Sequence, residues 1–438
     1  MYKNVAKLIL YSNLGKDSIL TALCDIFRDW EQKKTAPEDL VQRIYIQIKR
    51  LLDVSTDYGF DRNLWQDYLT FVMITNENSF SVTCEGVGPT EGGSVNEIAK
   101  NDFRIFHDLF HFDFGPIEQD LKIDCFSRIT NYKAISKREK TYNKDVSDIV
   151  QKLSVKLDAA VDENEFFDLI TEHYKTHGVG MFGFNKAFRI AGTGDAMEFC
   201  PINNADEIRL SDLIGYEIQK KELVRNTLAF CEGRKANDVL LYGDSGTGKS
   251  SSVKAVLNEY CDRGLRMIEI YKYQFRDLSN VIARIKKRNY KFIIFIDDLS
   301  FEEDEVEYKF LKAVIEGGVE SRPENVLIYA TSNRRHLIKE MWSDRDDMEY
   351  SGEIHRSDTM EEKLSLSSRF GITINYSVPS YQEYLDMVKT LAEWEGLLDV
   401  TDEKAVQELL AEARKWEIRH GGVSGRTAKQ FIHYIAGR

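Results

Sequence analysis

The sequence predicts an α/β fold: a five-stranded parallel sheet flanked by helices, followed by a helical lid and preceded by a mainly helical N-terminal domain. From about residue 206, short apolar runs rich in β-branched residues alternate with amphipathic helical patterns, as in sheets whose strands are joined by crossover helices. After Pro379 the strand pattern stops and helical patterns continue. The strands are expected at Val239–Tyr242, Met267–Tyr271, Phe292–Ile296, Val326–Ala330 and Ile372–Tyr376.

Length and composition restrict the class of protein. A chain of 438 residues is long enough for two or three domains. The net charge of −13 argues against a protein that mainly binds nucleic acid without sequence preference. Six scattered cysteines without a CxxC pair are expected to be reduced. The apolar runs are too short for a membrane span or a signal peptide, so we expect a cytoplasmic protein without membrane insertion.

The segment LLYGDSGTGKSS joins a predicted strand to a predicted helix and contains the pattern G-x-x-x-x-G-K-[ST]. Such a loop binds phosphate because its N–H groups point inward and the following helix adds the positive end of its dipole. We therefore expect a P-loop NTPase sheet that binds ATP and Mg²⁺, with Lys249 at the β and γ phosphates and Ser250 on the metal. The expected contact residues are Gly243, Asp244, Ser245, Gly246, Thr247, Gly248, Lys249, Ser250 and Ser251.

The run FIIFIDDLS places two acids, Asp297 and Asp298, directly after a buried strand. Ligands of open α/β sheets bind at the carboxyl ends of the strands. We expect Asp297 to hold magnesium, directly or through water, and Asp298 to orient or deprotonate the attacking water. An Asp in this position also commonly caps the next helix, and this structural alternative stays open for both residues.

Several segments in order resemble the AAA+ superfamily over most of residues 206–438: LSDLIGYEIQKKELVRNTLAF, LLYGDSGTGKSS, FIIFIDDLSFEE, NVLIYATSNRRHLI, EEKLSLSSRFG and GGVSGRTAKQF. Together they closely resemble a bacterial family of uncharacterised ATP-binding proteins of that superfamily. The resemblance implies an N-terminal domain of unknown role (1–205), an AAA+ nucleotide-binding domain (206–377) and a helical lid (378–438). It also implies a Mg-dependent ATPase that forms a homo-oligomeric ring, for instance a hexamer.

The resemblance assigns roles outside the phosphate loop. Ile214 and Gly215 match residues that contact adenine, and Asn333 matches the polar sensor that bonds the attacking water and the γ phosphate. Arg369 matches the arginine finger, which enters the site of a neighbouring subunit, and Arg426 matches a lid arginine that contacts the γ phosphate. A guanidinium suits this task because its paired hydrogen bonds neutralise charge spread over phosphoryl oxygens. Each arginine could instead be an ordinary surface or salt-bridged residue.

Position 298 departs from the superfamily, because most active members have Glu there. The Asp298 carboxylate is one methylene shorter, so it lies further from the water unless the backbone brings it closer. Glu302 and Glu303 could substitute for it, and slow hydrolysis is an open alternative. Arg334 and Arg335 compete with the finger residue as sources of positive charge.

Some further patterns are interpreted as structural. Two histidine pairs have the i, i+4 spacing of shared metal ligands but no evident third ligand, namely His107 with His111 and His173 with His177. Three aromatic residues at alternating positions, beginning at the end of a predicted strand, are interpreted as strand-end packing rather than as a pore loop that grips polypeptide: Tyr271, Tyr273 and Phe275.

Three functions are compatible with these motifs. The first is an ATPase that couples hydrolysis to conformational change in a macromolecule bound by residues 1–205, with an unknown protein client expected rather than nucleic acid. The second is a switch or scaffold that binds ATP with negligible turnover. The third is a loader acting on DNA, which the acidic composition and the absence of a helix-turn-helix pattern disfavour.

Overall fold

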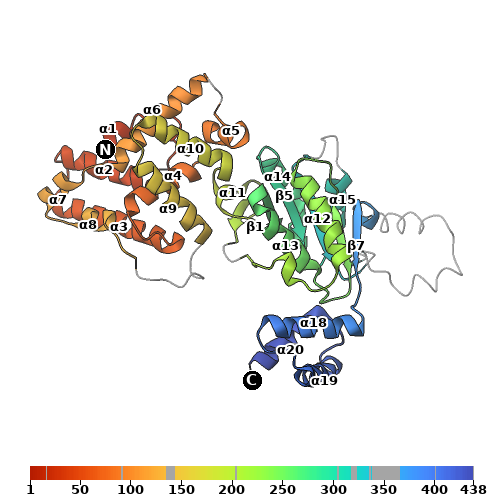
Figure 1. The fold of residues 1–438 in the computed structure, drawn as a ribbon. Helices are drawn as coiled ribbons and strands as arrows, with labels where there is room; N and C mark the ends of the chain where they lie inside the picture. The colour runs from red at the N-terminus through yellow and green to blue at the C-terminus, as the bar shows by residue number, and fades with distance from the viewer. Residues whose placement is uncertain are drawn as a thin grey trace. The chain divides into compact units, whose positions relative to one another are not determined.

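A computed structural model describes residues 1–15, 17–89, 92–134, 144–202, 205–302, 305–316, 323–334, 337, 366–399 and 401–437. They form two compact units, Met1–Asn185 (unit 1) and Lys186–Arg438 (unit 2). Figure 1 shows that unit 1 is helical, whereas unit 2 contains a sheet with helices packed against it and a group of lid helices. Within the described part of the chain, no helix combines the length and apolarity needed to cross a membrane.

Unit 1 contains only helices among its described residues: α1 (Tyr2–Val5), α2 (Ile19–Glu31), α3 (Pro37–Tyr58), α4 (Leu64–Thr75), α5 (Ser79–Val87), α6 (Ser94–Phe110), α7 (Gly115–Leu121), α8 (Cys125–Thr130), α9 (Lys144–Asp158), α10 (Glu163–His177) and α11 (Met181–Phe184). Their apolar faces meet in one core rich in aromatic residues. In this core the Phe114 and Phe126 rings stack with centroids 4.3 Å apart, and the Trp65 indole N–H donates to the Leu109 carbonyl over 2.7 Å. The mainly helical character expected for this region is confirmed.

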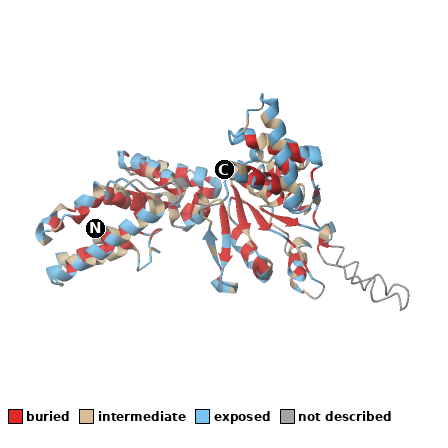
Figure 2. Cartoon of the chain, turned by 90° about the horizontal axis from the view of Figure 1, so that it is seen from below, coloured by how far each residue is buried: buried red, intermediate tan, exposed pale blue. Residues whose placement is uncertain are grey.

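Unit 2 contains a seven-stranded sheet in the order β2-β1-β4-β5-β6-β3-β7. Its strands are β1 (Ala187–Ala191), β2 (Glu198–Pro201), β3 (Val239–Gly243), β4 (Leu265–Glu269), β5 (Lys291–Ile296), β6 (Val326–Ser332) and β7 (Ile372–Tyr376). All neighbouring strands are parallel except β1 and β2. The central strands are almost wholly buried, as Figure 2 shows by their red colour, which explains their unbroken apolar runs.

The five predicted strands are all present, but the predicted strand number was wrong. The hairpin of β1 and β2 adds two strands before residue 205, where the helical N-terminal domain was expected to end. Its segment, AFRIAGTGDAMEFCP, is short and interrupted by two glycines, so its pattern resembles a loop. Strand β4 also ends at Glu269 rather than at Tyr271, because Tyr271 is the N-cap of the 3₁₀ helix η5 (Lys272–Asp277).

Helices surround the sheet and form the lid. Those of the α/β part are α12 (Glu217–Cys231), α13 (Lys249–Tyr260), α14 (Leu278–Ile285) and α15 (Glu307–Glu316), with short 3₁₀ turns η2 (Gly194–Ala196), η3 (Leu210–Asp212) and η4 (Cys261–Arg263). The lid consists of α18 (Tyr381–Trp394), α19 (Glu403–Arg419) and α20 (Gly425–Ala436), which share a small core of their own. A capping box starts α18, where the Ser380 hydroxyl accepts the Glu383 N–H. The lid thus packs as a separate small layer within unit 2.

Candidate nucleotide-binding site

The phosphate loop connects the end of β3 to the start of α13. Gly243 has φ +131°, and a Cβ on it would lie 2.1 Å from the Tyr376 carbonyl oxygen, so the close approach of β7 requires glycine. Gly248 has φ +91° with no atom within 4 Å of a Cβ position, so its backbone conformation is what requires glycine. The loop therefore leaves open space directly before the N-terminus of α13, where main-chain N–H groups and the helix dipole favour an anion.

Lys249, the first residue of α13, is 6% exposed and anchored on three sides. Its ammonium group donates to the main-chain carbonyls of Gly243 (2.9 Å) and Asp244 (2.6 Å) and to Asn333 Oδ1 (3.0 Å). Burial lowers the pKa of Lys249 below its usual value, while the nearby carboxylates oppose that change. Negative charge bound in this loop would favour the ammonium form further.

The Asp297 carboxylate lies beside the first turn of α13. Its Oδ1 accepts the Ser250 hydroxyl at 2.5 Å and the Thr331 hydroxyl at 2.5 Å. Carboxylate and hydroxyl oxygens are the hard ligands that Mg²⁺ prefers, and it binds few protein groups while keeping waters and phosphate oxygens. The pair of Ser250 and Asp297 fits that pattern, and the described residues contain no cluster of three or more acidic, histidine or cysteine ligands.

Asp298 has a left-handed backbone with φ +50°. Its N–H donates to the Thr331 hydroxyl oxygen over 2.9 Å, and its Oδ1 accepts the Asn333 side-chain N–H over 2.8 Å. The next described helix, α15, begins only at Glu307. The partners of both acids thus lie on α13, on β6 and in the turn after β6, which is an arrangement for a shared polar site rather than for helix capping.

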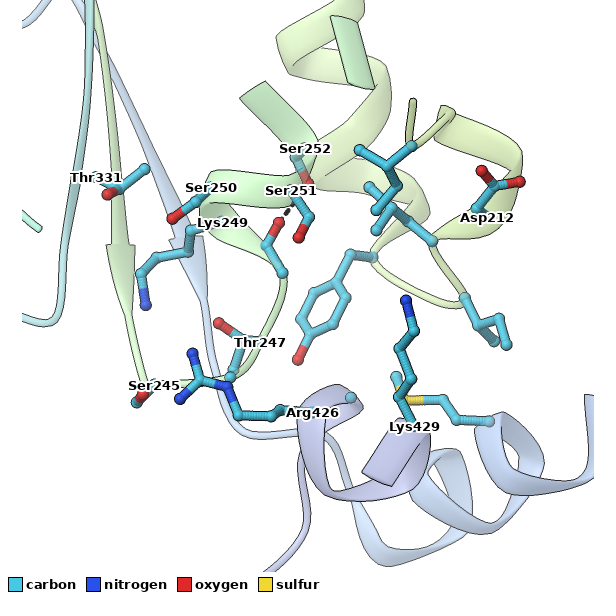
Figure 3. Close-up of a pocket in the computed structure, with 18 of the residues that line it drawn as sticks. Asp212, Ser245, Thr247, Lys249, Ser250, Ser251, Ser252, Thr331, Arg426 and Lys429 are labelled. Carbon is cyan, nitrogen blue, oxygen red and sulfur yellow. Dashed lines mark hydrogen bonds between the residues drawn. The ribbon is translucent and has the colours of Figure 1, made fainter. Parts of the chain in front are cut away.

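These groups line a cavity of about 550 Å³ between the phosphate loop and the lid. This volume lies in the range of small-molecule sites. Figure 3 shows Arg426 and Lys429 extending from α20 into the cavity, with Arg426 on the side of the phosphate loop. Twelve of the sequence-predicted residues line it: Ile214, Ser245, Gly246, Thr247, Gly248, Lys249, Ser250, Ser251, Asp297, Asp298, Asn333 and Arg426.

Comparison with known proteins places this chain in a family. Residues 184–438 match the family described as protein of unknown function (DUF815). The chain belongs to this family. The match spans more than half of the chain and contains the whole cavity, which confirms the resemblance to an uncharacterised family seen in the motifs.

Other comparisons of this DUF815 chain add little. No curated protein matches it significantly. Among solved structures, the RuvB Holliday junction branch migration motor of Thermotoga maritima matches with 16% identity and a TM-score of 0.32, covering 52% of this chain and 72% of that one. A variant of the same protein matches with 15% identity and a TM-score of 0.33 over the same shares. These values are too low for any property of RuvB to be transferred.

Four predicted residues of the DUF815 chain do not line the cavity. Gly243 and Asp244 lie beneath it and supply the carbonyls that hold the phosphate-loop lysine, and Asp244 Oδ2 also accepts the Val378 N–H over 3.1 Å. Gly215, with φ +80°, lies against the lid. Arg369 Nη2 pairs with Glu316 Oε1 at 2.8 Å.

The residues that were considered as substitutes for Asp298 and Arg369 do not form another candidate site within the described part of the chain. Glu302 and Arg334 are exposed and do not line the cavity. Glu303 and Arg335 lie outside the described residues. The His107 ring contacts the main-chain carbonyl of residue 160 at 3.2 Å in unit 1. His111 is the C-cap of the same helix α6, and His173 and His177 lie on α10 of that unit.

Several lining residues were missed by sequence reasoning: Asp212, Tyr216, Lys220, Thr331, Met387, Leu391 and Lys429. For two of them, the sequence position could have indicated a place in the site. Thr331 is a polar residue at the end of an apolar strand, two positions before Asn333, and Lys429 follows Arg426 by three residues and so shares its helix face. Tyr216 gave no such indication, because its place depends on packing: its ring stacks 5.0 Å from Tyr376, and burial raises its pKa to about 12.

Proposed function

We propose that this chain binds ATP together with Mg²⁺ in the 550 Å³ cavity and hydrolyses it. The observation that carries the proposal is one continuous hydrogen-bond path, formed by Lys249, Asn333, Asp298, Thr331, Asp297 and Ser250. The path joins a cation suited to phosphates, oxygens suited to magnesium and an acid suited to a water molecule. Phosphoryl transfer needs these three parts close together, because it depends on positioning and charge stabilisation.

The cavity has two sides that suit the two ends of ATP. The phosphate loop and Arg426 offer N–H groups and positive charge to a triphosphate. The lining also includes Leu213, Ile214, Met387 and Leu391, which offer an apolar surface to the base. Magnesium bound by Ser250 and Asp297 would bridge phosphate oxygens and neutralise part of their charge.

Calorimetry with Mg-ATP tests binding directly. Lys249→Ala removes a charge-assisted contact and should weaken binding by about 100-fold, since such contacts contribute roughly 1.5 to 3 kcal/mol. Lys254→Ala removes the same charge from the same helix at a position that does not line the cavity, so it should bind like the wild type. Absence of binding heat with the wild type, or equal heat in both variants, would contradict the proposal.

Slow turnover is favoured by one observation. The Asp298 carboxylate accepts the Asn333 amide, so this hydrogen bond competes with any bond from the acid to an attacking water. We therefore propose an ATPase whose rate is low and whose bound state itself has a role, as in a switch. A steady-state ATPase assay of the wild type and Asp298→Asn distinguishes a slow ATPase from a switch that only binds ATP. Measurable turnover that the variant loses supports hydrolysis, and tight binding without turnover supports the switch.

The active form is proposed to be a homo-oligomer acting on a protein client. Arg369 pairs with Glu316 and does not line the cavity of its own chain, which supports a role in the cavity of a neighbouring copy. The net charge of −13 makes nucleic acid a poorer partner than protein.

A further inference from the structure

The left-handed conformation of Asp298 requires an explanation. A non-glycine residue at φ +50° is uncommon, and the surrounding contacts must hold it there. Among the described residues, Lys33, Lys122 and Tyr216 also have positive φ. Lys33 and Lys122 each follow the end of a helix, where this conformation is ordinary, and Tyr216 is the N-cap of α12. Asp298 instead follows a buried strand and stands next to a metal-binding candidate.

Thr331 makes the contacts that define this turn. Its hydroxyl donates to Asp297 Oδ1 at 2.5 Å and accepts the Asp298 N–H at 2.9 Å. Its main-chain carbonyl accepts the Leu299 N–H at 2.7 Å. The residue is 1% exposed and lies in β6, paired with β3. A rigid, buried strand residue thus holds three consecutive residues of the neighbouring segment.

We propose that Thr331 is a positioning residue: its hydroxyl imposes the left-handed turn at Asp298 and fixes Asp297 beside Ser250. The role of Thr331 in ATP chemistry rests on the proposed function. Its role in setting the backbone turn at Asp298 does not. A threonine hydroxyl has one donor and two acceptor positions, so it can serve both neighbours at once. No other side chain is recorded in a hydrogen bond with the Asp298 N–H within the described residues.

The turn explains how a short acid can serve this site. Asp298 is one methylene shorter than glutamate, so an ordinary backbone would leave its carboxylate further from the phosphates. In the observed turn, Asp298 Oδ1 lies 2.8 Å from Asn333 Nδ2, and Asn333 Oδ1 lies 3.0 Å from Lys249 Nζ. The acid is therefore one side chain away from the phosphate-binding lysine, and the backbone compensates for the missing methylene.

Two substitutions of Thr331 distinguish the effect of its hydroxyl group from the effect of its side-chain shape. Thr331→Val keeps the branched shape and the main-chain bond to residue 299 but removes both hydroxyl contacts. Thr331→Ser keeps the hydroxyl and should restore function. Thr373→Val, at an exposed position of strand β7, controls for the same change of a strand threonine away from the cavity.

The decisive measurement is the magnesium dependence of ATP binding and turnover. In Thr331→Val we expect the Mg²⁺ concentration at half-saturation to rise about 10- to 100-fold, as for other residues that orient a metal ligand. ATP binding in EDTA should be unchanged, and turnover should fall without a matching change in KM. A purely structural role would instead reduce ATP binding with and without Mg²⁺, and equal defects in the valine and serine variants would overturn the proposal.

A crystal structure of Thr331→Val tests the geometric part without nucleotide. We expect Asp298 to leave the left-handed region and Asp297 to separate from Ser250. Asp298 retaining a positive φ in this variant would overturn the inference even if the chain binds ATP. Conversely, a wild type that does not bind ATP would refute the proposed function alone, because the altered turn would still show that Thr331 sets it.

Discussion

Both units hold carboxylates with close hydrogen bonds, but the donors differ. In unit 1, Asp102 is fully buried and accepts the main-chain N–H groups of Ile9, Leu10 and Tyr11 at 2.7 to 3.2 Å. In unit 2, Asp297 and Asp298 are exposed and accept from side chains around a cavity. Main-chain donors hold a carboxylate in a position that the backbone fixes. Side-chain donors at a cavity can instead move and form hydrogen bonds with a bound ligand.

The same difference predicts how the two units respond to substitution. Buried polar groups of unit 1 should affect stability and leave ATP chemistry unchanged. Polar groups that line the cavity of unit 2 should affect ATP chemistry with little change in stability. The experiments below test this division.

The largest effect is expected for Arg369→Ala. If Arg369 acts in the cavity of a neighbouring copy, its loss should reduce turnover about 1000-fold, which corresponds to roughly 4 kcal/mol of transition-state stabilisation. Stability should change by less than about 1 kcal/mol, because the pair with Glu316 is partly exposed. Turnover and urea unfolding of the same variant measure both quantities.

Mixing two inactive variants tests whether the arginine acts between chains. Lys249→Ala chains keep Arg369, and Arg369→Ala chains keep the phosphate loop, so a mixed oligomer contains some complete sites. Recovery of turnover on mixing supports action in the neighbouring copy. Failure to recover in mixed oligomers, or turnover that is independent of protein concentration, argues for an arginine that is only part of a surface ion pair.

The next largest effect is expected for Asp102→Ala in unit 1. The change leaves three buried or part-buried N–H groups without their charged acceptor and should lower the free energy of unfolding by about 3 kcal/mol or more. Asp108→Ala, at an exposed position of the same helix α6, is the control. ATP affinity of the folded fraction should match the wild type, and a loss of affinity equal to that of Lys249→Ala would contradict the division between the units.

The contrast also shows which features a sequence reveals. The phosphate loop and the acids after β5 are predictable because the chemistry requires those residue types at fixed spacing next to a buried strand. Asp102 is not predictable, because its partners lie more than 90 positions away and any helix could carry such an acid. Thr331 and Tyr216 lie between these cases, since their roles depend on contacts across strands and between sheet and lid. The hairpin of β1 and β2 was missed because sheet pairing overrides weak local propensity.

A smaller effect is expected at Asp67 on α4 of unit 1. This residue is 2% exposed, and its Oδ2 has no hydrogen-bond partner recorded among the described residues. Burial raises its pKa from 3.8 to about 6. Below the unfolded pKa both states are protonated and the site costs no stability. As the pH rises from about 3.8 to 6, the unfolded state loses this proton while the folded state keeps it, so stability falls across that window and stays lower above it.

Asp67→Asn removes the ionisation and should stabilise unit 1 near neutral pH. A shift of about two pKa units corresponds to about 3 kcal/mol as an upper limit, because the amide must also satisfy its own hydrogen bonds. At about pH 4 the advantage should be small, since this pH is close to the unfolded pKa of 3.8 and ionisation of the unfolded state then contributes little. Urea unfolding of the variant and of the exposed control Asp57→Asn at both pH values measures this dependence. A gain that is the same at both pH values would show that packing, rather than a buried charge, sets the cost at this position.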